Sequence, residues 1–161
     1  MEESITTVMV VSPHPDDAEI GAGGTIASWC RQGREVFYVI CTNGDKGSSD
    51  PNMTSENLAQ IRQQEQMNAA KILGVSNVIF LGYPDGGLED IPDFRGELVR
   101  LIRKHRPEVV LTTDPYRKYL WHRDHRITGI VTMDAIFPYA RDHLSYPEQI
   151  VEGLKPHKVK E

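Results

Sequence analysis

The 161-residue sequence lacks three features that would assign it to other classes of protein. It has no basic excess, since 18 Lys and Arg stand against 23 Asp and Glu, and a net charge of −5 does not provide the positive surface that nucleic-acid binding requires. No apolar run approaches the roughly 20 residues of a membrane-spanning helix. Cysteine is scarce: Cys30 and Cys41 stand in apolar segments without the spacing of a disulfide framework or a metal motif. We therefore expect neither nucleic acid nor a membrane as a partner.

The remaining composition is that of a globular protein, with 39% hydrophobic and 25% charged residues. Its length suits one domain, which we predict to span residues 1–161. The first four residues are acidic where a secretory signal would be basic, so we expect a cytoplasmic protein. Residues 158–161 look like the beginning of a further strand, which predicts a chain that lacks a C-terminal extension.

Apolar patterning predicts strands that alternate with helices. Strands are predicted at 5–11, 36–41, 78–81 and 109–113, and helices at 18–33, 55–73, 94–102 and 124–137. The strand at 36–41 is apolar without alternation, as in strands that are covered on both faces. This order predicts an α/β fold, a Rossmann-like three-layer sandwich with a largely parallel sheet.

Polar residues follow each predicted strand. The segments concerned are 13–19, 43–50, 85–87 and, after a short loop, 121–125. Because the carboxyl ends of parallel strands meet at one edge of the sheet, and ligands bind there, we expect these four segments to form one site. Their convergence is stronger evidence than any single motif.

Three residues from two of these segments have the chemistry of a metal site. His14 and Asp17 are three residues apart, and His125 comes from a distant part of the chain. Two imidazoles and one carboxylate match a catalytic zinc site that keeps one position open, and Fe²⁺ or Co²⁺ would also accept them. Asp16 then remains as a general base, and His122, on the same helical face as His125, is left to contact a substrate.

Each of these motifs also has a purely structural interpretation. His14 alone is compatible with an ordinary loop histidine, and Asp16 with Asp17 is compatible with the capped N-terminus of a helix. The pair His122 and His125 is compatible with a solvated helix start. Two such motifs at the same edge of the sheet favour the functional interpretation.

The predicted helix at 55–73 carries an unusual pair of charged residues. Its predicted inward stripe runs through positions 58, 61, 65, 69 and 72, so that Glu65 lies on the stripe and Arg62 beside it. Ionised groups that face inward are costly unless they are partnered. Either Arg62 and Glu65 satisfy each other, or Arg62 serves the site.

A glycine-rich stretch at 21–24 offers a different function, that of a dinucleotide-binding module. The pattern is incomplete, because Ile26 stands where the third glycine of the motif belongs and no acidic residue ends the second strand. We expect these glycines to allow close packing of helix on sheet. A non-catalytic module that binds a metal or a nucleotide remains the alternative, against which the presence of Asp16 and His122 argues.

Two motifs, HPDDAE at 14–19 and HRDH at 122–125, are specific when they occur together. Through them the chain resembles the LmbE-like (PIG-L) family of zinc-dependent N-acetylglucosamine deacetylases. Further segments resemble the family in the same order: 42–45, 62–65, 73–75 and 84–88. The resemblance implies a metal-dependent amidohydrolase that removes the N-acetyl group of a small amino-sugar substrate, and it implies a homo-oligomer.

The resemblance also implies roles for individual residues. It makes His14, Asp17 and His125 the zinc ligands and Asp16 the general base. His122 stabilises the oxyanion or protonates the leaving amine.

Four further residues receive supporting roles. Arg62 and Asp85 are expected to contact substrate, although a turn-forming role for Asp85 is equally compatible with its position. Asp124 is expected to orient an imidazole or to cap the last helix, two roles that are compatible, and Glu19 to support the site or the helix dipole without being a ligand.

Overall fold

In the computed structural model, which describes residues 6–118 and 121–161, strands and helices alternate as the sequence predicts. The elements are β1 (Thr7–Ser12), α1 (Asp17–Arg31), β2 (Glu35–Thr42), α2 (Ser55–Leu73), β3 (Asn77–Tyr83), α3 (Pro92–His105), β4 (Val109–Leu111), α4 (Arg123–Asp134), the π-helical turn η1 (Ala135–Tyr139) and α5 (Pro147–Val151). The start of the predicted first strand, at Ile5, lies outside the described residues. The last predicted helix ends earlier than expected, because the backbone of Phe137 is extended (φ −147°, ψ 124°) before Pro138.

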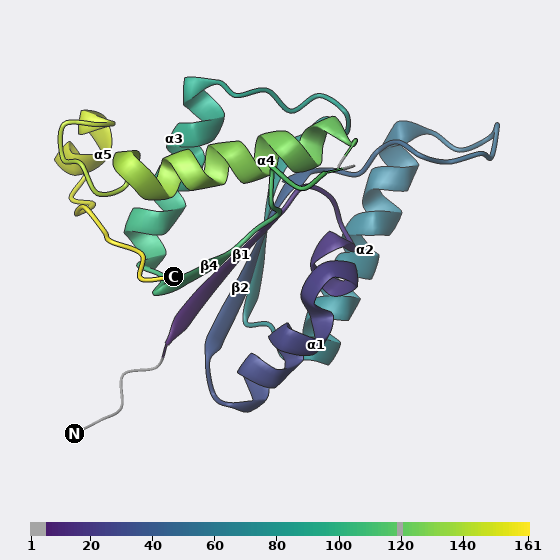
Figure 1. The fold of residues 1–161 in the computed structure, drawn as a ribbon. Helices are drawn as coiled ribbons and strands as arrows, with labels where there is room; N and C mark the ends of the chain where they lie inside the picture. Colours follow the sequence, from purple (N-terminus) through teal and green to yellow (C-terminus); the bar gives the residue numbers. More distant parts are fainter. Residues whose placement is uncertain (1–5, 119–120) are drawn as a thin grey trace.

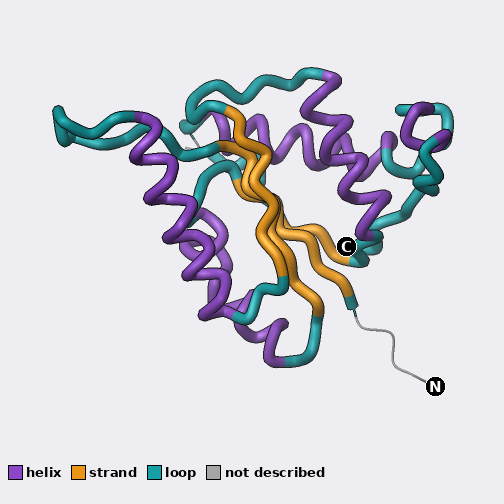
Figure 2. Tube along the Cα trace, turned by 180° about the vertical axis from the view of Figure 1, so that it is seen from behind, coloured by secondary structure: helices purple, strands orange, loops and turns teal. Residues whose placement is uncertain are grey.

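The four strands form one parallel sheet in the order β3-β2-β1-β4. Helices α1 and α2 cover one face of the sheet, and α3 and α4 cover the other (Figures 1 and 2). The prediction of a three-layer α/β fold with a parallel sheet is confirmed. Among the described residues, no helix combines the length and the hydropathy needed to cross a membrane.

The alternation of side chains along β1 explains why two helical layers are needed. Val8 and Val10 pack into the core under α1 and α2, whereas Met9 and Val11 pack into the core under α3 and α4. All four side chains are buried, because successive residues of a strand point to opposite faces. The carboxyl ends of the four strands therefore open at one edge, between the two helical layers.

The predicted inward stripe of α2 is wrong by one position. Ile61 and Glu65 are exposed and Ile72 is 85% exposed, whereas Gln66 and Ala70 are buried. The buried face thus runs through 58, 62, 66, 70 and 73, a rotation that the sequence hides by placing a glutamine on the buried side. This rotation turns Arg62 and Gln66 toward the site.

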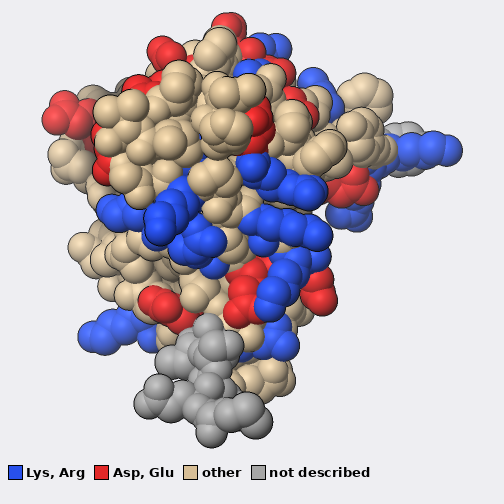
Figure 3. All heavy atoms as spheres, turned by 90° about the vertical axis from the view of Figure 1, so that its left-hand side faces the viewer, with Lys and Arg blue, Asp and Glu red and all other residues tan. Residues whose placement is uncertain are grey.

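The C-terminal residues lie beside β4. The backbone N–H of Glu161 donates to the carbonyl of Glu108 (3.1 Å), and the N–H of Val110 donates to the carbonyl of Glu161 (2.9 Å), which is a parallel pairing pattern. Figure 3 shows a band of Lys and Arg side chains on the side of the molecule that carries α3, α5 and the C-terminal segment, although the chain is acidic as a whole. The exposed basic residues at the end of α3, at its C-cap and in the C-terminal segment are Lys104, Arg106, Lys155, Lys158 and Lys160.

His105, in the last turn of α3, makes the stability of the fold depend on pH. Its ring packs against that of Phe37 at a centroid distance of 4.7 Å. Burial, and then the charge of Lys104, lower the pKa of His105 below 6.5. The unfolded chain therefore takes up this proton first, and the unfolding free energy contributed here falls as the pH drops below about 6.5.

We expect His105→Phe, which keeps the aromatic contact, to flatten the pH dependence of stability. Urea unfolding midpoints at pH 7.5 and pH 5.5 measure this, and the drop between them is expected to be smaller in the variant than in the wild type. His143→Phe, at an exposed position, is the matched control and keeps the wild-type drop. Equal drops in His105→Phe and the wild type would contradict the assignment.

Candidate metal centre

The edge of the sheet gathers these predicted residues from two loops and two helix starts. His14 follows β1, Asp17 is the first residue of α1, and Asp85 follows β3. His122 and His125 stand at the beginning of α4, which starts at Arg123. The close approach of α4 to the end of β4 needs Gly129, where a Cβ would lie 2.4 Å from the carbonyl oxygen of Thr113.

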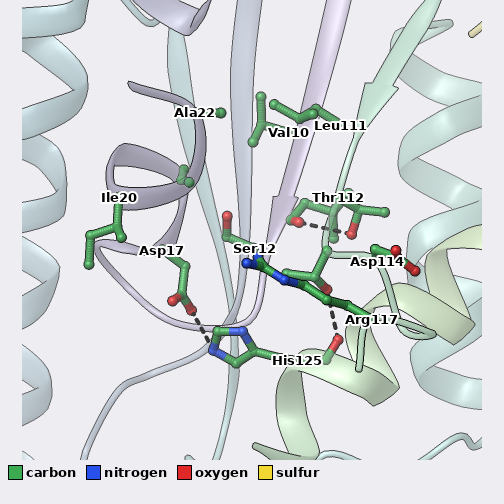
Figure 4. Close-up of a pocket in the computed structure, with 14 residues that line it drawn as sticks. Val10, Ser12, Asp17, Ile20, Ala22, Leu111, Thr112, Asp114, Arg117 and His125 are labelled. Carbon is green, nitrogen blue, oxygen red and sulfur yellow. Dashed lines mark hydrogen bonds and ion pairs between the residues drawn. The ribbon is translucent and has the colours of Figure 1, made fainter. Parts of the chain in front are cut away.

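Asp17 lies between the two imidazoles that were predicted with it. Its Oδ2 is 3.0 Å from Nδ1 of His14 and 3.2 Å from Nε2 of His125. Figure 4 shows the carboxylate of Asp17 and the ring of His125 pointing toward one another. The ligand atoms of a tetrahedral zinc site lie about 3.3 Å apart, given bonds of about 2.0–2.1 Å. The two distances from Asp17 to the imidazoles therefore fit such an ion.

The other ring nitrogen of His14 faces two carboxylates. Nε2 lies 3.0 Å from Oδ2 of Asp124 and 3.0 Å from Oδ1 of Asp85. Because carboxylates only accept hydrogen bonds, both ring nitrogens of His14 donate in this cluster, Nδ1 to Asp17 and Nε2 to Asp124 and Asp85. A metal on the Asp17 side would take the place of the proton on Nδ1, while Nε2 keeps its proton. Asp124 and Asp85 thus hold the ring of His14 as outer-shell carboxylates hold metal-binding histidines.

Asp124 is not the cap of α4. It is fully buried and accepts hydrogen bonds from the backbone N–H groups of Gly86 (2.7 Å) and Leu88 (3.2 Å). His122 takes the cap position, because its Nδ1 accepts the N–H of Asp124 (3.2 Å). Of the two roles expected for Asp124, the structure therefore places it in the first, beside an imidazole.

The charges of this cluster shift the pKa values of its two central groups, His14 and Asp17. Burial alone would lower the pKa of His14, but its hydrogen bond to Asp17 and the charges of Asp85 and Asp17 raise it on balance. Burial would raise the pKa of Asp17, but hydrogen bonds from His125 and His14 hold it well below its usual range. The site is thus an ion-paired cluster, and a cation bound there is expected to replace protons.

Two groupings among the described residues have the spacing of a metal site between all their donor atoms, and neither is the predicted set. One consists of His14, His122 and His125, and the other of His14, Asp85, His122 and Asp124; within each, the donor atoms lie within 4.8 Å of one another. The predicted set differs from the first grouping only in having Asp17 in place of His122. Geometry alone therefore does not assign the ligands, and the predicted set stays a prediction.

Asp16 lies on the rim of a cavity of about 320 Å³ that His14, His122, Asp85, Arg62 and Lys46 also line. Its side chain is 59% exposed and makes no capping hydrogen bond to α1. The carboxylate therefore faces the cavity and not the helix end, contrary to the capping interpretation. Lys46 was not expected here, and no local pattern in its loop points to it.

Arg62 forms its hydrogen bonds with residues of the site and not with Glu65. It donates to the carbonyl of Pro15 (2.8 Å), to Oδ2 of Asp16 (3.1 Å) and to the carbonyl of Gly44 (3.3 Å). A Cβ at Gly44, where φ is +63°, would lie 3.0 Å from Nη1 of Arg62. The internal Arg62–Glu65 pair is therefore excluded, because Glu65 is exposed while Arg62 crosses to the β1–α1 turn.

Glu19 lies behind the cavity, where its Oε1 accepts a hydrogen bond from Gln66 (2.9 Å). Gln66 is 2% exposed, and its Oε1 accepts the backbone N–H of Asp16 (2.8 Å). The sequence analysis missed Gln66. The signal that points to it is its spacing of four residues from Arg62, which places both side chains on one helical face.

A second cavity of about 380 Å³ borders the donors from the β4 side (Figure 4). Asp17 and His125 line it together with Ile20, Thr112 and Arg117, and Figure 4 shows the side chain of Arg117 extending across it. The donor set can therefore be approached from two sides.

The glycines at 21–24 do not form a phosphate-binding turn, because they lie inside α1 and not between β1 and α1. The expectation that they allow close packing is also wrong. A Cβ at Gly21 or Gly24 would meet no atom within 4 Å among the described residues, and one at Gly23 would meet only the side chain of Glu19. The nucleotide-binding alternative loses its structural basis.

The sequence model of the family described as PIG-L, GlcNAc-PI de-N-acetylase, matches residues 9–136. The chain belongs to the PIG-L family. It is 35% identical over 155 residues to a diacetylchitobiose deacetylase of Thermococcus kodakarensis, an alignment that covers 96% of this chain and 58% of the relative.

Solved structures of similar proteins have the same fold as this chain. N,N′-diacetylchitobiose deacetylase from Pyrococcus horikoshii, complexed with its inhibitor MPG, superposes with a TM-score of 0.94 at 33% identity, over 98% of this chain and 59% of that one. GalB of Pseudomonas putida, a 4-carboxy-2-hydroxymuconate hydratase, superposes with a TM-score of 0.83 at 27% identity, over 97% of this chain and 63% of that one. The chain thus spans about three fifths of each of these proteins, and the similar fold of a hydratase means that the reaction must be argued from the site.

Proposed function

We propose that this protein is a zinc-dependent amidohydrolase that removes the N-acetyl group of an N-acetylglucosamine-containing small molecule or glycoconjugate. One observation carries the proposal: a cavity-facing carboxylate, Asp16, and an imidazole, His122, line the same cavity as His14 of the candidate donor set. Metal storage would need neither of them. The deacetylase relative at 35% identity supports the choice of substrate class.

We assign the metal to His14, Asp17 and His125. Two imidazole nitrogens and one carboxylate oxygen suit zinc, and also Fe²⁺ or Co²⁺. When bound, such an ion would polarise the amide carbonyl and lower the pKa of water in contact with it from 15.7 toward about 7.

The side chains around the cavity supply the remaining chemistry. Asp16 accepts a proton from the attacking water as its oxygen bonds to the carbonyl carbon. Arg62, which donates to Oδ2 of Asp16, holds the carboxylate in place at 3.1 Å. The C–N bond then breaks, and the products are acetate and a free amine.

His122 is a hydrogen-bond donor to the oxygen of the reacting carbonyl, and the proton that Asp16 takes from water passes to the leaving nitrogen. Nδ1 of His122 accepts the backbone N–H of Asp124, so its ring proton is on Nε2, the nitrogen that remains free to donate. The same N–H is suited to stabilising the negative oxygen that develops on the carbonyl. Capping of α4 therefore also fixes the tautomer that the reaction needs.

Arg62, Asp85 and Lys46 line the cavity and give it hydrogen-bond donors and acceptors for sugar hydroxyls. Asp85 is held by His14, and its backbone N–H donates to Asp45 (3.1 Å), so its position does not depend on a ligand. Which amino sugar the cavity accepts depends on the parts of the sugar outside its acetamide group. The homo-oligomeric state and the cytoplasmic location remain predictions.

Acetate release tests the proposal. The metal-free protein, reconstituted with one equivalent of zinc, is incubated with N-acetylglucosamine and N,N′-diacetylchitobiose, and acetate and free amine are measured together. We expect both products in equal amounts, and no reaction in the protein after chelation. A protein that binds zinc and leaves both acetamides intact, but hydrates an unsaturated carboxylate, would favour the chemistry of the hydratase.

A further inference from the structure

Asp16 has a backbone conformation that few residues other than glycine adopt. Its φ is +87° and its ψ is −24°, in the left-handed region. This region is sparsely populated by residues with a Cβ, and such a conformation persists only where surrounding groups enforce it. The groups that enforce it therefore determine where the carboxylate of Asp16 lies.

The peptide unit between Pro15 and Asp16 is held at both of its polar groups by side chains of α2. The carbonyl of Pro15 accepts a hydrogen bond from Nη2 of Arg62 (2.8 Å). The N–H of Asp16 donates to Oε1 of Gln66 (2.8 Å). Because Arg62 and Gln66 are four residues apart, one face of one helix fixes the orientation of this peptide plane.

Glu19 fixes which end of the Gln66 amide faces Asp16. A carboxylate only accepts hydrogen bonds, so Nε2 of Gln66 must point to Oε1 of Glu19 (2.9 Å), and its carbonyl oxygen must point to the N–H of Asp16. Gln66 is buried at 2% exposure, where loss of either partner leaves a polar group unsatisfied. The three residues thus form a chain that ends at the turn carrying the proposed base.

We infer that Gln66, oriented by Glu19, is a positioning residue that holds Asp16 in its left-handed conformation and so places the carboxylate in the cavity. The kinetic consequence rests on the proposed function, but the positioning itself does not. Arg62 contacts both the carbonyl of Pro15 and the carboxylate of Asp16, whereas Gln66 is hydrogen-bonded to the backbone N–H of Asp16 and not to its carboxylate. Its effect on a reaction must therefore pass through Asp16.

Amide hydrogen exchange of Asp16, measured by NMR on the folded protein, tests the positioning without any substrate. In Gln66→Met the length of the side chain is kept and both hydrogen bonds are lost. We expect exchange at Asp16 to accelerate by about tenfold or more. Gln64→Met is the matched control on the exposed side of α2 and leaves the Asp16 amide protected. Unchanged exchange in Gln66→Met would overturn the inference whatever reaction the protein catalyses.

Deacetylation kinetics test whether the positioning matters to the base. We expect Gln66→Met to lower kcat by about 10–100-fold, as for a misplaced catalytic group, with zinc content and KM unchanged. In an Asp16→Asn background, Gln66→Met is expected to cause no further loss of kcat, because the carboxylate that Gln66 positions is already absent. Equal losses in both backgrounds would mean a structural role and would overturn the inference.

A swap of the two polar side chains keeps the test decisive if Gln66→Met does not fold. Gln66→Glu alone sets two carboxylates against each other and is expected to release the Asp16 amide. Glu19→Gln combined with Gln66→Glu restores a donor opposite an acceptor, so it is expected to restore protection of that amide. Failure of the double variant to restore it, in a protein that melts as the wild type does, would exclude the proposed chain. If the protein proves not to be a deacetylase, the exchange measurements alone decide.

Discussion

The variant His14→Ala is expected to lose its metal, whereas the wild type, purified without added metal, carries about one zinc or iron ion per chain. Nδ1 of His14 lies 3.0 Å from Oδ2 of Asp17, and its Nε2 is held by Asp124 and Asp85. Removing the imidazole removes one donor of three and also the cation that the surrounding carboxylates share. Metal analysis by mass spectrometry, before and after chelation, measures the loss and needs no substrate.

Comparison with His122→Ala decides whether His122 belongs to the ligand set. If Asp17 is the third ligand, His122→Ala keeps its metal and loses turnover by about 10²-fold or more. If His122→Ala loses the metal as well, His122 is a ligand, as in both groupings that contain it. His143→Ala, at an exposed position, is the matched control and retains metal in either case.

Two outcomes would count against the metal centre itself. Full metal content in His14→Ala would remove His14 from the ligands. Absence of metal from the folded wild type, with none taken up on reconstitution, would remove the centre and leave the cluster as a network of ion pairs. His14→Ala also leaves the buried Asp124 without its imidazole partner. Asp17→Asn is therefore measured in parallel, because it removes a proposed ligand and keeps the pair of His14 and Asp124.

The main features of the fold follow from local sequence patterns. Short β-branched strands that are apolar on both faces must be covered by helices on both sides. Together with the alternation of strands and helices along the chain, this predicts a parallel sheet between two helical layers. The parallel sheet in turn predicts that His14, Asp85 and His125 meet, because every strand ends at the same edge. These residues come together from positions more than 100 residues apart by topology alone.

Features that depend on the rotation of a helix were not predictable in the same way. On α2, the apolar residues Ile61 and Ile72 are exposed while the amide of Gln66 is buried, so hydrophobicity indicates the wrong face. A buried amide is favourable only when its partners are in place, and those partners, Asp16 and Glu19, come from another element. The sequence pattern carries no information about such distant pairing.

The role of Asp124 shows a different limit. Its position before a helical run is typical of an N-cap, and the cap interpretation uses only local sequence. In the structure the backbone N–H groups of Gly86 and Leu88 and the ring of His14 surround its carboxylate, and His122 caps the helix instead. A carboxylate that serves three long-range partners cannot be distinguished from a cap until the loops that supply them are placed.

Asp16→Asn is expected to bind zinc normally and to lose turnover by about 10²–10⁴-fold, the usual contribution of a general base. The substitution is well matched to the site, because asparagine tolerates the left-handed backbone that Asp16 adopts at φ +87°. Its amide keeps the volume of the carboxylate and can still accept from Arg62. What it lacks is the ability to take a proton from water, so the loss falls on kcat.

The alternative role of Asp16 is to neutralise Arg62, whose Nη2 lies 3.1 Å from its Oδ2. Both side chains of this pair are partly exposed, and such pairs contribute little to stability. On that interpretation Asp16→Asn would keep kcat close to that of the wild type and change mainly KM, through the altered charge of the cavity. Steady-state kinetics of acetate release separate the two, with Asp93→Asn on the exposed side of α3 as the control that keeps both constants. A kcat within about twofold of the wild type would remove Asp16 as the base, since a lost base costs far more.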